Sequence, residues 1–258
     1  MRSILFLKHD YWVIRDSIRT AGKHDYSLNF QFVPEIEPCF DGPSGIRARG
    51  KDGSEFALFT FGGQGKWLAR DGWVSECYRE RTAAPGVSFA GKTDGNQELV
   101  TFLTPDSPKD RIRWIRETEA IGGRAFELGR DDYLDLIMIG NGGLVQTEAV
   151  NSNFEWSWVR FDHRNSKITE MVLLLGSRID CQTKIRLESP QTHAWVVLKH
   201  PSNDECEVSA DSVDDFSVRI TGAKKIRFNG NEIGLPQVAD HDASSVDLQL
   251  PFATEMTR

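Results

Sequence analysis

The sequence lacks any long apolar run, and this absence excludes two kinds of segment. No stretch reaches the roughly 18 consecutive apolar residues that a transmembrane helix needs. The apolar part of the N-terminus is only Ile4–Leu7 before Lys8, which is too short for the core of a signal peptide. With 39% hydrophobic and 27% charged residues among 258, the composition predicts a soluble, globular chain of one large domain or two modest ones.

Cysteine is scarce, and its placement argues against metal chemistry. The four cysteines, Cys39, Cys77, Cys181 and Cys206, are scattered without paired spacing. Structural thiols are the favoured interpretation, and a disulfide stays open. Because zinc sites in proteins use closely spaced pairs of ligands, we expect no metal and no other cofactor in this chain.

An excess of positive charge is also missing. The formal net charge is −7, so the chain as a whole should not attract polyanions, and a site for nucleic acid or acidic glycan would need a local basic patch. P-loop, G-x-S-x-G and H-E-x-x-H motifs are absent. Gly62–Lys66 is rich in glycine, but no helix signal follows it, so it is weak evidence for a phosphate site.

What the sequence does contain is period-two alternation, with no convincing amphipathic helix. Residues 9–32, HDYWVIRDSIRTAGKHDYSLNFQF, predict two strands around a tight bend. Further strands are predicted at Glu55–Phe61, Leu99–Leu103, Tyr133–Ile139, Phe154–Asp162, Glu170–Leu175, His193–Lys199, Phe216–Ile220 and Val246–Leu250. Turn signals separate them at Asp41–Pro43, Asp52–Gly53, Asp71–Gly72, Gly122–Gly123 and Asn141–Gly142. The clearest hairpin is Ile226–Ile233, with Asn229–Gly230 at the two positive-φ positions of a type I′ turn.

Many short strands with turn chemistry between them predict an all-β protein, an antiparallel two-sheet β-sandwich followed by a smaller β-domain. We place the sandwich at residues 1–163, the smaller domain at 164–240 and a tail at 241–258. The boundary is drawn at the polar stretch Asp162–Lys167 between two strands.

Few residues suggest acid–base chemistry. Asp16 is predicted on the strand face of Trp12, Ile14 and Ile18. On such an apolar face we favour a structural carboxylate that accepts hydrogen bonds from backbone N–H groups, and a catalytic acid is the alternative. His24 is a candidate general base or substrate contact, because imidazole titrates near neutral pH, although a solvated strand entrance is favoured. Two other observations disfavour metal sites: His193 and His200 project from opposite faces of one strand, and His241 lies in the predicted tail.

The other substrate-contact candidates are basic or aromatic. Lys109–Arg116, KDRIRWIR, is the strongest positive patch, with Arg111 and Arg113 outward and Ile112 and Trp114 inward. For this patch we favour an edge strand whose solvent-facing side is charged. The alternative is that its arginines bind sulfate or carboxylate groups of a ligand. Trp73, Tyr78 and Arg79 form a second set of candidates. Aromatic residues such as Trp67, Trp73 and Tyr78 stack on sugar rings, but core positions are the commoner role.

Several segments follow one another in a distinctive order: LKHDYWVIRDSI, GKHDYSLNFQFVPE, a glycine-rich turn, GWVSECYRERTAAPGVSF, TFLTP, YLDLIMIGNG, WVRFDHRNSKITEMVLLLGSRI and KKIRFNGNEI. This order resembles the C-terminal half of the heparinase II/III-like polysaccharide lyases. The resemblance runs from about Ile4 to Gly234. It implies an N-terminal α/α toroid, a central antiparallel sandwich and a small C-terminal β-domain. Such enzymes cleave acidic polysaccharides by β-elimination, with Tyr and His residues that abstract the proton beside a uronate carboxylate.

The resemblance carries no catalytic or metal residue onto this sequence. The family's Tyr, His and structural zinc ligands lie on the toroid and the first sandwich strands, which would precede Met1. We therefore expect the chain to be the β-rich portion of such a lyase, inactive alone, with an exposed sheet edge. Its expected partners are acidic polysaccharide and either the toroid half or a second copy, with no nucleic acid and no membrane. Relatives are usually periplasmic or secreted. The alternative is a freestanding, non-catalytic sandwich that binds carbohydrate or protein.

Overall fold

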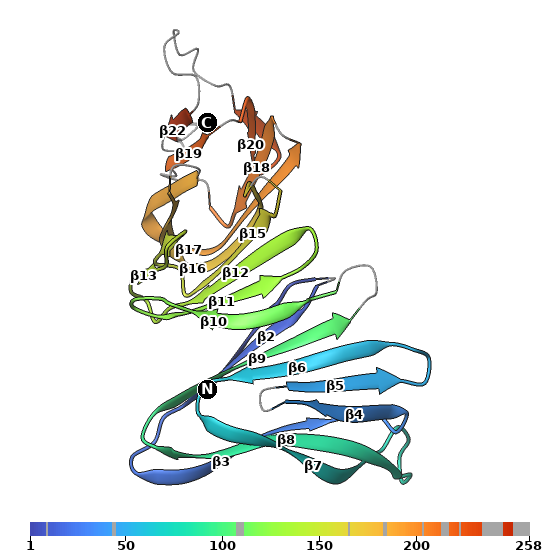
Figure 1. The fold of residues 1–258 in the computed structure, drawn as a ribbon. Coiled ribbons are helices and arrows are strands. Elements are labelled where there is room, and N and C mark those ends of the chain that lie inside the picture. Colours follow the sequence, from blue (N-terminus) through green and yellow to red (C-terminus); the bar gives the residue numbers. More distant parts are fainter. Residues whose placement is uncertain are drawn as a thin grey trace. The chain divides into compact units, whose positions relative to one another are not determined.

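The computed structural model describes residues 1–249 except 9, 43–44, 107–110, 165, 183–184, 203, 213–216, 222 and 234–244. In these residues every regular element is a β-strand (Figure 1), so the all-β prediction is confirmed. The described residues contain no helix of the length and apolarity that crossing a membrane requires. The chain divides into two compact units, Met1–Ile112 (unit 1) and Arg113–Arg258 (unit 2).

Unit 1 consists of two antiparallel sheets. The six-stranded sheet has the order β1 (Arg2–Phe6), β2 (Trp12–Ile18), β9 (Gln97–Asp106), β6 (Glu55–Phe61), β5 (Gly45–Gly50) and β4 (Ile36–Asp41). The three-stranded sheet has the order β3 (Lys23–Gln31), β8 (Thr82–Asp94) and β7 (Gln64–Val74). The predicted strands around the bend at Gly22 thus enter different sheets, β2 in the larger and β3 in the smaller.

The core of unit 1 lies between these sheets, because alternate residues of each strand turn inward. The three-stranded sheet contributes Tyr26, Leu28, Trp67, Val87 and Phe89, and the six-stranded sheet contributes Ile46, Ala48, Leu58 and Leu99. Trp67 and Phe89 meet edge to face at 5.4 Å between ring centroids. Full burial of each large side chain stabilises the fold by about 1.5–3 kcal/mol. The predicted two-sheet sandwich is confirmed in unit 1.

At the β1 edge the six-stranded sheet keeps apolar side chains in solvent. Ile4 is 57% exposed and Phe6 is 53% exposed, with the Phe6 ring stacked on Trp12 at 5.0 Å. On the same sheet face Arg2 donates two hydrogen bonds to Asp16, at 2.7 and 3.0 Å. Asp16 is therefore structural, as favoured from the sequence, but its partner is this guanidinium on the neighbouring strand.

Unit 2 is built on one sheet of thirteen strands. Its main path is β10 (Trp114–Thr118), β11 (Arg124–Gly129), β12 (Tyr133–Ile139), β15 (Trp156–Asp162), β16 (Ile168–Cys181), β17 (Ile185–Ser202), β18 (Glu205–Ala210), β20 (Lys225–Phe228) and β21 (Asn231–Ile233). Off this path lie β13 (Val145–Gln146), β14 (Asn151–Ser152), β19 (Ser217–Thr221) and β22 (Ser245–Gln249). All described pairs are antiparallel except β18 with β20.

The long strand β17 divides the sheet of unit 2 into two branches, because its two ends pair with different strands. Residues 185–188 pair with β19, and residues 196–202 pair with β18 (Figure 1). Between these ends the pairing with β16 shifts register after Gly176, where Leu175 has φ 58°. A Cβ on Gly176 would collide with the Cα of Phe154, so this close approach requires glycine. The bulge bends the two strands and lets the sheet curve around an apolar core.

Local turn predictions had mixed success. The hairpin at Ile226–Ile233 is confirmed: Phe228 pairs with Asn231, and Asn229 and Gly230 have φ 46° and 81°. The turn predicted at Asp71–Gly72 is wrong, because both residues pair with β8 inside β7. The Gln31 amide lies where a Gly72 side chain would be, so a larger residue at this position would displace that amide. Phe216 and Leu250, the ends of two predicted strands, lie outside the described residues.

The division of the chain differs from the predicted domain boundary. The stretch Asp162–Lys167 joins β15 and β16, which pair from Trp156 opposite Leu174 to Phe161 opposite Ile168. Its polar residues therefore mark a hairpin connection within one sheet, and the two units separate at residues 112 and 113. In the predicted tail, β22 pairs with β19, while His241 lies outside the described residues.

Candidate functional site

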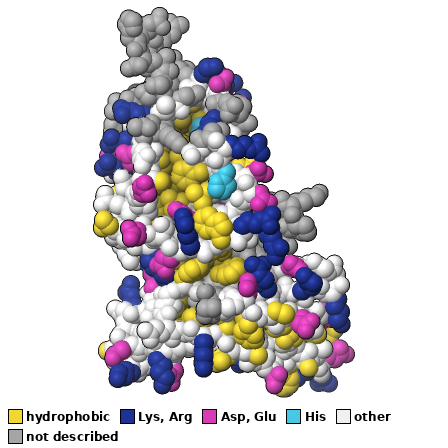
Figure 2. All heavy atoms as spheres, viewed as in Figure 1, with side chains coloured by type: hydrophobic (Ala, Val, Ile, Leu, Met, Phe, Trp, Pro, Cys, Tyr) yellow, Lys and Arg dark blue, Asp and Glu magenta, His cyan; other side chains and the backbone are white. Residues whose placement is uncertain are grey.

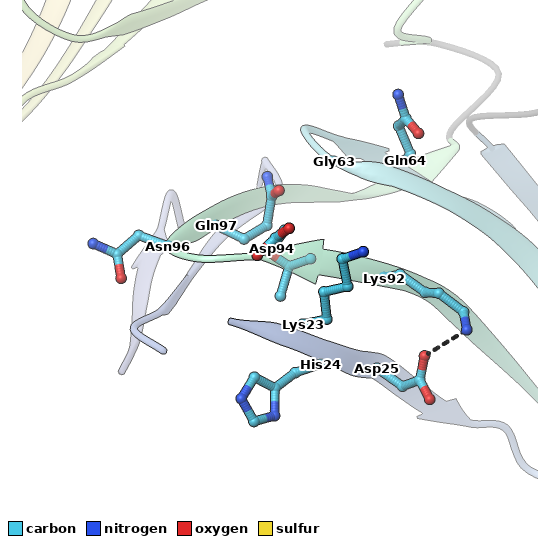
Figure 3. Close-up of a pocket in the computed structure, with 10 residues that line it drawn as sticks. Lys23, His24, Asp25, Gly63, Gln64, Lys92, Asp94, Asn96 and Gln97 are labelled. Carbon is cyan, nitrogen blue, oxygen red and sulfur yellow. Dashed lines mark ion pairs between the residues drawn. The ribbon is translucent and has the colours of Figure 1, made fainter. Parts of the chain in front are cut away.

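A polar groove of unit 1 lies where β3 begins and β8 ends. It encloses about 650 Å³ and receives residues from β3, β7, β8 and β9 and from the turns before β7 and β9 (Figure 3). Its lining consists of Lys23, His24, Asp25, Gly63, Gln64, Lys92, Thr93, Asp94, Asn96 and Gln97. Amide, carboxylate and ammonium groups in one groove are the donors and acceptors that bind polar ligands such as sugars.

Charges of opposite sign alternate across the two strands at this groove. The register places Lys23 opposite Asp94 and Asp25 opposite Lys92. The Lys92 ammonium lies 3.5 Å from the Asp25 carboxylate, and both side chains are at least 80% exposed. Exposed pairs of this kind contribute little to stability, so a ligand carboxylate can replace the partner of either lysine at small cost.

His24 lies in the lining but at a solvated position. Its Nε2 is 3.2 Å from the carbonyl oxygen of Ala21, and its side chain is exposed. In Figure 3 the ring lies on the opposite side of β3 from Lys23 and Asp25, as the strand alternation requires. The predicted strand entrance is confirmed, and contact with substrate stays a prediction.

Tyr26 adds a buried hydroxyl beneath the groove, at a position to which the sequence assigned no catalytic role. The side chain is 8% exposed, and its hydroxyl has no hydrogen-bond partner among the described residues. A Cβ on the lining residue Gly63 would lie 2.6 Å from this oxygen. Burial raises the pKa of Tyr26 above its ordinary value, so the phenol holds its proton. The only sequence signal was its place in the alternating strand Lys23–Gln31.

A second pocket, of about 360 Å³, holds Arg111 with Arg47 and Arg49. Every arginine in it faces a carboxylate: Arg47 Nε is 2.6 Å from Asp41, Arg49 pairs with Glu55, and Arg111 is 4.0 Å from Glu55. The arginine charges are therefore largely balanced within the protein. Lys109 and Asp110 of the same predicted patch lie outside the described residues.

Arg113 belongs to unit 2, and Arg111 belongs to unit 1. Arg113 donates two hydrogen bonds of 2.7 Å to Asp131, and these bonds lower the pKa of Asp131. The strand begins only at Trp114, as the edge strand of its sheet. The inward direction predicted for Trp114 is wrong, because the residue is 40% exposed with the Arg116 guanidinium 4.8 Å over its ring.

The aromatic candidates lie at the far end of the β7–β8 hairpin. Trp73 is 58% exposed with the Arg81 guanidinium 3.8 Å from its ring centroid, and Tyr78 is 88% exposed with Arg79 at 5.2 Å. Arg79 has φ 71°, in the left-handed region. Trp67, in contrast, is buried in the sandwich core.

The structure does not bring the six candidates into one site. On β8 the partner of His24 is Thr93, and the partner of Trp73 is Ala83. Ten residues of extended strand separate these partners, a distance of about 33 Å. His24 thus lines the groove, Arg111 lines the arginine pocket, Arg113 stands in unit 2, and Trp73, Tyr78 and Arg79 stand at the hairpin end.

The two histidines of β17 have structural partners in unit 2. Buried His193 shares a 2.9 Å hydrogen bond with Asp211, and His200 lies 3.2 Å from the carbonyl oxygen of Glu205. All four cysteines are free; Cys39 and Cys77 are exposed, and burial raises the pKa of Cys206 to about 12. No group of three or more His, Cys, Asp or Glu side chains in the described residues is placed to hold a metal ion.

The comparison with known families agrees with this division of the chain. Residues 1–115 match the family model described as heparinase II/III-like, C-terminal. This segment is similar to the C-terminal region of heparinase II/III-like proteins. The resemblance stated from the sequence is thereby confirmed for unit 1, while the segments quoted from residues 133–233 lie outside the match. The family association points to polysaccharide lyases. No curated protein matches the sequence.

Proposed function

We propose that the chain is the β-rich portion of a heparinase II/III-like lyase and that unit 1 binds acidic, uronate-containing polysaccharide at the groove of Figure 3. The observation that carries the proposal is the groove itself, which lies within the segment that matches the family. Two lysines, two aspartates, three amide side chains and an imidazole line it. Lysine ammonium groups bind carboxylates, and amides bind sugar hydroxyls.

The distribution of charge supports a binding role for unit 1. Residues 1–112 contain 15 lysine and arginine residues against 15 aspartate and glutamate residues, so their formal charge is zero. Residues 113–258 contain 16 lysine and arginine residues against 23 aspartate and glutamate residues, so they carry the whole net charge of −7. A polyanion therefore meets no net repulsion from unit 1, and Figure 2 shows basic and acidic side chains interspersed over its visible face.

The groups in the groove support binding rather than β-elimination by the chain alone. Elimination needs a base that reaches the proton beside the uronate carboxylate and a group that neutralises this carboxylate. The Tyr26 hydroxyl is buried beneath the lining, and its raised pKa disfavours the phenolate. His24 is the imidazole in the groove, but its ring lies on the other side of β3 from Lys23.

Titration of the full chain with an alginate oligosaccharide tests the proposal, with dextran as the uncharged control polymer. We expect alginate to bind, and Lys23→Glu/Lys92→Glu to weaken binding about tenfold or more because two attractive charges become repulsive. Arg19→Glu/Lys51→Glu makes the same change in net charge at exposed positions outside the groove and should bind nearly as wild type. Equal losses in the two variants would contradict the assignment of the groove.

A further inference from the structure

The outer face of the three-stranded sheet has a regular pattern that the groove does not explain. Tyr26, Leu28, Trp67 and Phe89 turn into the core, so the alternate residues turn outward. Between Thr82 and Lys92 the outward positions of the central strand β8 hold only small residues: Ala84, Gly86, Ser88 and Ala90. Ala84 and Ser88 are 5% and 4% exposed. Small residues in a row leave a low floor along the middle of the sheet.

Polar side chains border this floor on both sides. Outward on β3 are Ser27, Asn29 and Gln31, and outward on β7 are Lys66, Leu68 and Arg70; all six are exposed. The register sets Ser27 and Lys66 opposite Ala90, Asn29 and Leu68 opposite Ser88, and Gln31 and Arg70 opposite Gly86. We call this surface, together with Lys23, Asp25, Lys92 and Asp94 at its end, the strip.

Several of these side chains lie flat across β8. Arg70 donates a hydrogen bond to the Asn29 side chain on the far strand. The Gln31 amide donates to the carbonyl oxygens of Ala84 and Pro85, at 3.2 and 2.8 Å. These bonds hold the donors and acceptors of the strip in place before any ligand arrives, which lowers the entropic cost of binding.

The charge of the strip differs from that of the unit that carries it. Its cations are Lys23, Lys66, Arg70 and Lys92, and its anions are Asp25 and Asp94, so it has two positive charges in excess. Unit 1 as a whole has a formal charge of zero. The strip is therefore a local basic surface, as the sequence requires of any polyanion site in a chain with net charge −7.

The strip is long and continuous with the groove. From Asp94 to Ala84 the central strand spans ten residues, about 33 Å. Lys23, Asp25, Lys92 and Asp94 belong to the groove lining and also begin the strip. A ligand that fills the groove and follows the strip must be an extended polymer.

We propose that the strip binds an anionic polysaccharide chain that lies along β8 and continues from the groove. This inference rests on the proposed function and adds the surface and the direction of the bound chain. The outward positions between Asp94 and Ala84 carry no aromatic side chain on the described strands, so no platform for stacked nucleobases is present there. Cations, hydroxyls and amides spread along the strip can bind the carboxylates and hydroxyls that repeat along a polysaccharide.

The test uses the full chain, an alginate disaccharide that fits the groove alone and a longer alginate oligosaccharide. We expect Lys66→Glu/Arg70→Glu to weaken binding of the long ligand about tenfold, with little change for the disaccharide. The matched control Arg19→Glu/Lys51→Glu should leave both affinities nearly unchanged. In wild type, the affinity gain of the long ligand should shrink as salt rises, because the strip contacts are exposed.

Three results would overturn the inference, and they separate it from the proposed function. If Lys66→Glu/Arg70→Glu binds both ligands as wild type while Lys23→Glu/Lys92→Glu loses both, only the groove binds, and the proposed function stands. If the strip variant loses the disaccharide as strongly as the long ligand, the strip does not act as an extension. If wild type binds neither alginate ligand, both proposals fail. Thermal unfolding of each variant verifies that the sheet is intact.

Discussion

Unit 1 and unit 2 are both built from strands, but they place their charged side chains differently. The sandwich core of unit 1 is apolar and aromatic, with Trp67 against Phe89 between the sheets. Lys23, Lys66 and Lys92 stand outside, along the groove and the strip. In unit 2 a carboxylate is buried completely: Asp135 accepts hydrogen bonds of 2.7 and 2.8 Å from Arg160, whereas the buried Arg15 of unit 1 pairs with the partly exposed Glu98.

This difference separates two uses of polar residues. A buried ion pair has its geometry fixed by packing and costs several kcal/mol to break, so it serves structure. Exposed cations with weak partners can exchange them for a ligand. Unit 1, which matches the family model, keeps its formal charge at zero, whereas unit 2 is acidic. The comparison therefore points to unit 1 for contact with polyanions.

The largest expected effect in unit 1 is loss of an aromatic from the sandwich core. Phe89 is 3% exposed and covers Gly65, so Phe89→Ala leaves a cavity between the sheets. We expect the free energy of unfolding to fall by about 3–5 kcal/mol, measured by urea denaturation followed by Trp fluorescence. A loss below 1 kcal/mol would mean that the sheets do not pack as described.

The matching change in unit 2 removes a buried charge. Asp135→Ala leaves the Arg160 guanidinium, whose side chain is only 13% exposed, without this carboxylate. We expect a loss of about 3–5 kcal/mol in the same urea experiment. Asp16→Ala is the control from unit 1, since its partner Arg2 is 47% exposed and can be hydrated; about 1 kcal/mol is expected. Equal losses would contradict the contrast between the units.

A smaller effect is expected at the β20–β21 hairpin of unit 2. The Asn229 side chain accepts a hydrogen bond from Ala210 N at 3.0 Å and donates one to Ala210 O at 3.2 Å. Asn229→Ala loses both bonds and places alanine at φ 46°, for a cost of about 1–2 kcal/mol. Asn229→Gly keeps the backbone conformation accessible and should cost less. The order of the two urea midpoints tests this explanation.

The smallest effect concerns pH. Burial, with a contribution from the Lys167 charge, lowers the pKa of His200 below its ordinary value. The unfolded chain then takes up the proton first as pH falls. The stability from neutral His200 is complete above about pH 6.5 and is lost as pH falls through the lowered pKa. Between neutral pH and about pH 5, wild type should lose more stability than His200→Gln. A parallel decline in both proteins would exclude His200 as a cause.

Much of the fold was predictable because strand alternation and turn chemistry are local signals. Glu55–Phe61 and Tyr133–Ile139 have the bounds that the sequence predicted, and Asn229–Gly230 turns as expected. The domain boundary was misplaced at the polar stretch Asp162–Lys167, because a hairpin connection and an interdomain linker have the same composition. A turn was wrongly predicted at Asp71–Gly72, because the sequence alone does not distinguish a glycine that packs under the Gln31 amide from a glycine in a turn.

The candidate site was less predictable because its residues come together only through pairing. Lys23 and Lys92 are far apart in sequence and meet at the groove through the β3–β8 register, which sets them beside Asp94 and Asp25. One signal was present in the sequence: the outward small residues of Ala83–Lys92 alternate with Val87 and Phe89. That pattern predicts a strand with small side chains on its solvent-facing side, once it is known which residues face the core.

The measurement that tests the central claim most directly is a titration of the full chain with alginate oligosaccharide, with unsaturated uronate product followed by ultraviolet absorbance in the same samples. We predict saturable binding that dextran does not compete with, and no release of unsaturated product. Product formed by this chain alone would contradict the claim that it binds without elimination. Absence of binding would contradict the assignment of unit 1 as the surface that contacts the polysaccharide.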